Sequence, residues 1–176
     1  MSERGTAAIE LAMAIMIMLM LAIGAYEWGT GFADRIAMTS AVREAGRVGS
    51  AAGQLPDADC RIIEAAASAL NAVAGNPVKG LWIYESDKVG VVGLSRQVYV
   101  PTDDEDVDLV CAGNNWTLSS GGWPSSARSN SGANRDWLGV KVIVDHEWKT
   151  GFLWWNGSLE WEEDAVFRLE PAVVGG

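Results

Sequence analysis

The chain has 176 residues and a formal net charge of −10 at pH 7. This length suits one modest domain together with an anchor, and the acidic balance argues against nucleic acid as a partner, because phosphates require a basic surface. Residues 1–53 carry four basic and five acidic side chains, so nearly all of the negative excess lies beyond residue 53, as suits an extracytoplasmic domain.

The amino terminus combines a glycine, a single carboxylate and an apolar run. Gly5 precedes Thr6, and Glu10 is the fifth residue when the count starts at Thr6. The run Leu11–Tyr26, which follows, contains no charged residue. An ionised Glu beside such a segment costs on the order of several kcal/mol unless it finds a partner, so Glu10 is a candidate functional residue.

Two interpretations of this apolar run remain open. Counted from Thr6, it reaches about twenty-one residues, which is enough to cross a hydrocarbon core about 30 Å thick. A cleaved secretory signal peptide is the alternative, with residues 23–25 as a small-residue cleavage site. The anchor is favoured, because the amino-terminal region has a single Arg and because Glu10 interrupts the core that a signal peptide requires.

The helix is expected to continue well beyond the apolar run. No proline occurs between Gly29 and Gly49, and Pro56 marks the end of the helical pattern. We predict one helix over residues 6–53, with its first half in the membrane and a kink or local melting at Gly29-Thr30-Gly31. Small residues recur at every fourth position and form a ridge that favours close helix packing, although the helix propensity of alanine explains the same pattern. The ridge consists of Ala25, Gly29, Ala33, Ala37, Ala41, Ala45, Gly49 and Gly53.

Three segments of this helix together carry a family resemblance. They are Arg4–Leu11, which contains the glycine and the glutamate, then Tyr26-Glu27-Trp28-Gly29, then the Ala- and Arg-rich stretch Ala41–Arg47. Over roughly residues 4–52, the chain resembles the TadE-like family, the minor pilins or pseudopilins of the tight-adherence type IV pilus.

The resemblance implies a processing step and a role in assembly. A prepilin peptidase would cut after Gly5, so that residues 1–5 are a short leader and Thr6 is the mature amino terminus. Glu10 would then neutralise the amino terminus of a neighbouring pilin subunit. The chain would cross the inner membrane once with an extracytoplasmic head, enter an extracellular pilus, and contribute to pilus assembly, adhesion and surface attachment.

Residues 54–176 are expected to form an α+β head, giving a type IV pilin-like fold. A helix over residues 57–76, capped by Asp57 or Asp59, precedes strand patterns rich in β-branched and aromatic residues. The Gly-, Ser- and Asn-rich stretch 113–136 is expected to be a long loop. The strands predicted for an antiparallel sheet are residues 78–85, 89–100, 138–148 and 159–169.

The two cysteines, Cys60 and Cys111, are not part of a CxxC motif. In an exported chain, two cysteines about fifty residues apart predict one disulfide, which would pin the second helix to the region of Cys111. Two unrelated buried thiols are the alternative.

No nucleophile, phosphate-binding or metalloprotease motif occurs, so we expect neither an enzyme nor a cofactor. The one histidine, His146, lies on a predicted strand and is expected to be structural. The acidic run 103–108 lacks the glycine and the distant glutamate of an EF-hand loop, which favours a solvated loop over a calcium site. Trp154-Trp155 would be an interaction patch if exposed, and burial against the sheet is the alternative.

A second function class stays open at this point. The chain would then be a secreted or membrane-anchored extracytoplasmic binding domain that does not polymerise, with carbohydrate as the candidate ligand of its tryptophan-rich head.

Overall fold

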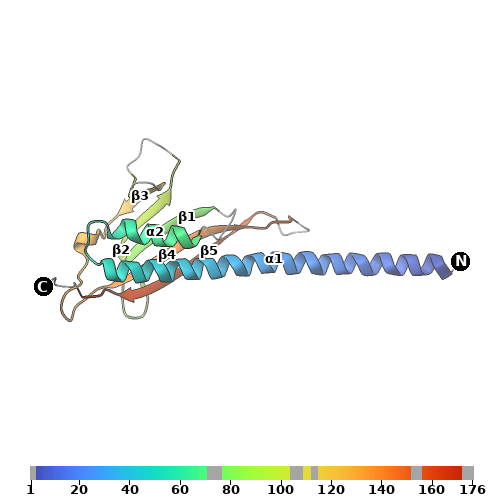
Figure 1. Cartoon of the computed structure of the whole chain (residues 1–176), viewed down its shortest axis with the longest axis horizontal. Coiled ribbons are helices and arrows are strands. Elements are labelled where there is room, and N and C mark those ends of the chain that lie inside the picture. The colour runs from blue at the N-terminus through green and yellow to red at the C-terminus, as the bar shows by residue number, and fades with distance from the viewer. Residues whose placement is uncertain (1–2, 71–76, 104–108, 112–114, 152–155, 172–176) are drawn as a thin grey trace.

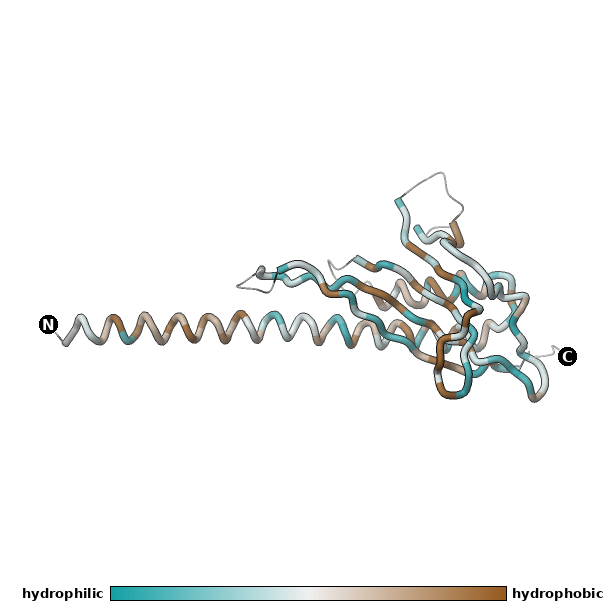
Figure 2. Tube along the Cα trace, turned by 180° about the vertical axis from the view of Figure 1, so that it is seen from behind, coloured by the Kyte–Doolittle hydropathy of each residue, from teal (hydrophilic) through white to brown (hydrophobic). Residues whose placement is uncertain are grey.

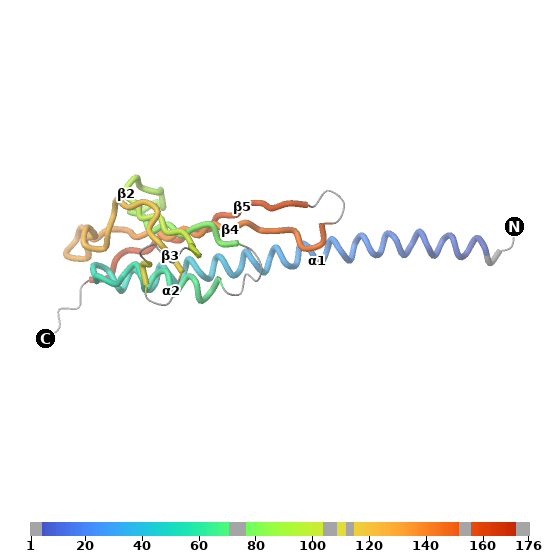
Figure 3. Tube along the Cα trace, turned by 90° about the horizontal axis from the view of Figure 1, so that it is seen from above, coloured from blue at the N-terminus to red at the C-terminus, as the bar shows by residue number. Residues whose placement is uncertain are grey.

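The computed structural model describes residues 3–70, 77–103, 109–111, 115–151 and 156–171, with the side chains of residues 3 and 4 excepted. Two helices, α1 (Glu3–Ala52) and α2 (Ala58–Leu70), precede five strands. The strands form an antiparallel sheet in the order β3-β2-β1-β4-β5, and both helices lie side by side on one face of it (Figures 1 and 3). This confirms the predicted α+β, pilin-like class. The strands are β1 (Val78–Ser86), β2 (Val92–Pro101), β3 (Trp116–Gly121), β4 (Trp137–Glu147) and β5 (Ser158–Arg168).

The amino-terminal half of α1 stands free of the rest of the molecule (Figure 1). At 1.5 Å per residue, the 50 residues of α1 measure about 75 Å. Large apolar side chains between Ile9 and Leu21 are exposed, and Figure 2 shows this stretch as mostly hydrophobic. Its length and hydropathy suit a membrane crossing. The helix is unbroken from Gly29 to Gly31, so the local melting predicted there does not occur.

The carboxy-terminal half of α1 forms the core together with α2 and the sheet. Met38 and Val42 of α1 are completely or almost completely buried there. A Cβ atom on Gly49 would lie 2.8 Å from Cδ1 of Ile62, so the glycine allows α2 to approach α1 closely. The carboxy-terminal part of the small-residue ridge, from Ala37 to Gly49, is buried in this core. Its first three residues, Ala25, Gly29 and Ala33, are exposed. The other core residues include Ile63, Ala66, Leu81, Ile83, Val140 and Val142.

The stretch 113–136 is only partly the loop that the sequence predicts. Strand β3 lies within it and pairs with β2, and a 3-10 turn spans Ser125–Ala127. Trp116 is buried, but residues 118–121 of this edge strand are exposed and mostly small or polar. An edge strand with so little burial lacks the alternation that identifies a strand in sequence.

Some predictions concern residues that the structure does not describe. The acidic run beyond Asp103 and the pair Trp154-Trp155 lie outside the described residues, as does the predicted end of the second helix after Leu70. The predicted strand 89–100 begins only at Val92, because residues 87–91 form a turn.

Candidate functional site

Gly5, Thr6 and Glu10 lie in the first turns of α1, at its free end. The Glu10 side chain is exposed and has no partner within the described part of the chain. Thr6 and Glu10 are four residues apart, so they share one face of the helix with a rise of about 6 Å between them. The predicted cleavage point and the predicted pairing carboxylate are thus both accessible to another molecule.

Glu27 lies directly after the apolar run and is completely buried, whereas Tyr26 and Trp28 beside it are 56% and 61% exposed. Its carboxylate accepts hydrogen bonds from the backbone N–H groups of Lys149 (3.1 Å) and Thr150 (2.5 Å), and from the hydroxyl of Thr150. Lys149 and Thr150 begin the connection from β4 to β5. Glu27 therefore fastens the end of this hairpin to α1.

Asp34 and His146 form a second tie between α1 and the hairpin. Oδ2 of Asp34 lies 2.7 Å from Nδ1 of His146 on β4, and both side chains are buried. The His146 ring stacks on Trp161 of β5, with ring centroids 4.2 Å apart and planes within 1° of parallel. The Arg35 guanidinium lies 5.2 Å from the centroid of Trp161 and pairs with Glu163. His146 is thus a packing residue at the point where α1 leaves the head.

A groove runs beside these two ties, between α1 and the β4–β5 hairpin. It has a volume of about 450 Å³ and largely apolar walls. Glu27 and Arg35 also line it, but the hairpin backbone and Glu163 already engage their charged groups. We call it the aromatic groove, and the residues that define it are Trp28, Phe32, Trp148, Leu159 and Trp161.

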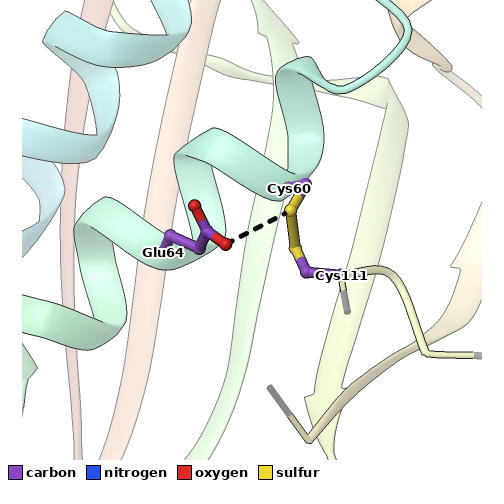
Figure 4. A group of neighbouring side chains, drawn as sticks. All are labelled: Cys60, Glu64 and Cys111. Atoms are coloured by element: carbon purple, nitrogen blue, oxygen red, sulfur yellow. Dashed lines mark hydrogen bonds between the residues drawn. A yellow bond between two sulfur atoms is a disulfide. The ribbon is translucent and has the colours of Figure 1, made fainter. Parts of the chain in front are cut away.

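A disulfide joins Cys60, in the first turn of α2, to Cys111, with Cα atoms 5.2 Å apart (Figure 4). The two residues are 51 positions apart, and the chain-entropy account assigns such a bond about 4 kcal/mol of stabilisation. The Glu64 carboxylate lies 3.6 Å from Sγ of Cys60. These three residues are the convergent candidate metal ligands in the described part of the chain, but sulfurs in a disulfide are not the thiolates that bind metal.

Asp59 connects α2 to the sheet, although the sequence suggested it as a helix cap. Its carboxylate accepts a hydrogen bond from the Tyr99 hydroxyl on β2 (2.5 Å) and pairs with the guanidinium of Arg128. Arg128 is almost completely buried and lies 4.9 Å from the ring centroid of Trp123. This network holds the loop after β3 against α2.

The buried tyrosines predict a loss of stability in alkali. Burial raises the pKa of Tyr99 and of Tyr84, and the carboxylates of Asp59 and Asp164 raise each further. An unfolded tyrosine ionises near pH 10, whereas the two folded tyrosines stay protonated at that pH. The free energy of unfolding is therefore unaffected by these groups below pH 10. Above pH 10 it falls by up to about 1.4 kcal/mol per pH unit for each residue, because only the unfolded state loses the proton. Urea midpoints of the full chain in detergent between pH 8 and 11 should therefore fall less steeply for Tyr99→Phe. An unchanged slope in that variant would contradict the assignment.

The structure separates the residues that the sequence singled out. Gly5, Thr6 and Glu10 lie at the free end of α1, and the disulfide lies in the head. The sequence reasoning did not assign roles to Glu27 and Asp34. A signal for Glu27 was present, since an acid flanked by two aromatic residues directly after an apolar run requires a buried partner or a function.

The comparisons with known proteins concern the same helix. Residues 5–47 match the family model of TadE-like proteins, and this range includes Gly5, Glu10, Glu27 and Asp34. No curated protein and no solved structure matches the chain. The family is associated with the tight-adherence pilus and is not known for enzymatic activity, so the match implies a pilus-associated protein. The resemblance inferred from the sequence is thereby confirmed: residues 5–47 of this chain form a TadE-like segment.

Proposed function

We propose that this chain is a minor pilin or pseudopilin of a tight-adherence type IV pilus, which acts by assembly rather than by catalysis. The proposal rests mainly on the position of Glu10 in α1. This residue is an exposed carboxylate with no partner in the described part of its own chain, and it lies in the apolar half of a free-standing helix. A neighbouring subunit that supplied an amino terminus would remove the cost of leaving this charge in an apolar environment.

The proposed division of the chain follows from the same helix. Residues 1–5 are a leader that a prepilin peptidase removes, residues 6–53 are the assembly helix with its membrane anchor, and residues 54–176 are the head. The head lies outside the inner membrane, where an oxidising environment sustains the Cys60–Cys111 disulfide. The acidic head contacts other pilins or a surface, which is how the subunit contributes to adhesion.

The amino-terminal residue of the mature protein tests this proposal. Mass spectrometry of the chain from membrane and sheared-pilus fractions should find Thr6 at the amino terminus, together with the intact Cys60–Cys111 disulfide. A Gly5→Leu variant should retain Met1 or Ser2, because the peptidase requires the small residue. A mature start near Tyr26 would instead identify a signal peptide and favour the secreted binding domain.

A further inference from the structure

The aromatic groove adjoins the apolar run of α1. Glu27, the first residue after that run, lines the groove, and Gly31 lines it about one turn further on. The hairpin reaches the same level, because Thr150 bonds to Glu27 and because a Cβ atom on Gly31 would lie 3.8 Å from Nε2 of His146. Figures 1 and 3 show this end of the head directed along α1 toward its free half. Whatever surrounds the apolar run therefore also lies close to the groove.

The length of the apolar run places the groove at a membrane surface. From Thr6 to Tyr26 the helix rises about 30 Å, which matches the thickness of a hydrocarbon core, and a headgroup layer of roughly 5–7 Å follows on each side. Glu27 and Gly31 lie about 2 Å and 8 Å beyond Tyr26 along the helix. When the run spans the hydrocarbon core, the groove therefore opens within the headgroup layer.

The side chains around the groove are those that favour this layer. On α1, Tyr26, Trp28 and Phe32 are 56%, 61% and 65% exposed, and Leu159 of the hairpin is 51% exposed. Trp and Tyr are enriched at membrane–water interfaces, where the ring contacts lipid while its polar atom stays close to water. The apolar walls of the groove gain free energy when the methylene groups of a lipid replace water against them.

The charged groups of the groove are compatible with the uncharged part of a lipid. The hairpin backbone engages Glu27, and Glu163 pairs with Arg35, so neither charge is left unpaired when water leaves the groove. Glu160 alternates with Leu159 along β5, so its side chain faces away from the groove. The walls therefore suit acyl chains and the glycerol region rather than an anionic headgroup.

We propose that the aromatic groove holds a phospholipid of the extracytoplasmic leaflet while α1 spans the membrane. Acyl-chain methylene groups pack against the rings of Trp28, Phe32 and Trp161, and the lipid headgroup stays in water. The β4–β5 end of the head thus rests in the membrane surface, which holds the head at a fixed height and orientation before the subunit enters a pilus. The proposal rests on the membrane anchor of the proposed function, to which it adds a membrane contact made by the head.

Photocrosslinking of the unmodified full chain tests this contact. The chain is reconstituted as single copies in nanodiscs of phosphatidylcholine that carries a diazirine on an acyl chain, close to the glycerol. After illumination, the lipid adducts are mapped by mass spectrometry of peptides. Adducts are expected on the apolar run and also on Trp148, Leu159 or Trp161 of the hairpin. Adducts confined to α1 would overturn the proposal.

Two matched variants separate binding in the groove from random encounters with lipid. Leu159→Asp should lower the hairpin adducts roughly tenfold relative to those on the apolar run, because a carboxylate among the rings does not accept methylene groups. Leu118→Asp makes the same change on edge strand β3, where the leucine is 45% exposed, and should leave the hairpin adducts unchanged. Equal hairpin adducts in the two variants would contradict binding in the groove.

A spin label tests the alternative that another subunit covers the groove. Both native cysteines are paired, so a label attaches to the new thiol of Leu159→Cys. In nanodiscs this label should meet oxygen more often than a water-soluble nickel complex, like a label at Ile15→Cys in the apolar run. A label at the exposed Ser131→Cys, near the carboxy end of α1, should show the reverse.

The outcomes for the groove and for the proposed function are distinct. A label at position 159 that is open to the nickel complex in nanodiscs and shielded only in pili would overturn the lipid contact and place another subunit in the groove. The proposed function stands in that case. A mature start other than Thr6 overturns that function, whatever the lipid adducts show.

Discussion

Replacing Glu10 by alanine is expected to abolish pilus assembly while leaving the chain in the membrane and the head folded. The apolar run gains hydrophobicity, so insertion should persist. Within the described residues, the hydrogen bonds and groove contacts that join α1 to the β4–β5 hairpin begin at Glu27, well beyond Glu10. In the filament, however, the amino group of Thr6 would remain as an unpaired charge among apolar helices. Removing one partner of a buried ion pair costs about 3–5 kcal/mol, which is roughly a hundredfold or more in equilibrium.

Incorporation of the Glu10→Ala chain into sheared pili, measured by immunoblot against the membrane fraction, checks this expectation. Glu3→Ala is the matched control, because it removes the same side chain from the predicted leader, which the proposed processing would cut off. Glu10→Gln should behave like Glu10→Ala, since an amide keeps the shape but not the charge. Normal incorporation of the Glu10→Ala chain into pili would refute the pairing role of Glu10.

The elements that the sequence predicts well are those in which many residues repeat one pattern. The core face of β4 reads Leu138, Val140, Val142 and Val144, all buried, because every second residue of a strand faces the same side. The helix α1 is equally well marked by its proline-free length. Edge strand β3 was not predicted. Trp116 is its one buried residue, so the sequence of this strand shows no alternation of apolar and polar residues.

The ties between α1 and the hairpin could not be predicted from local patterns. Asp34 and His146 are 112 positions apart, and Glu27 and Thr150 are 123 apart, so no periodicity relates them. Each is a single polar residue whose partner is set by how the sheet lies on the helix. Only the fold shows that these groups are buried and identifies the partners that satisfy them.

Asp34→Ala is expected to lower the free energy of unfolding by about 2–3 kcal/mol, because it leaves a buried donor or acceptor unsatisfied. Nε2 of His146 already lacks a hydrogen-bond partner in the described part of the chain. Without Asp34, Nδ1 would lack one as well, in a site closed by Trp161 and α1. Urea unfolding of the full chain in detergent, followed by tryptophan fluorescence, measures the loss. Glu64→Ala, which removes an exposed acid from α2, should leave the midpoint nearly unchanged.

A double variant separates hydrogen bonding from packing at this junction. In Asp34→Leu with His146→Phe, the phenyl ring keeps the stack on Trp161, and neither member of the Asp34–His146 pair is left buried without the other. Replacing both partners of a buried pair by apolar groups of similar shape is close to neutral, so the double variant should recover most of the stability that Asp34→Ala loses. If it is as unstable as the single variant, the cost lies in the shape of the junction rather than in the unsatisfied imidazole. The sign of the coupling between the two positions therefore decides whether the pair is kept for its hydrogen bond or only for its fit.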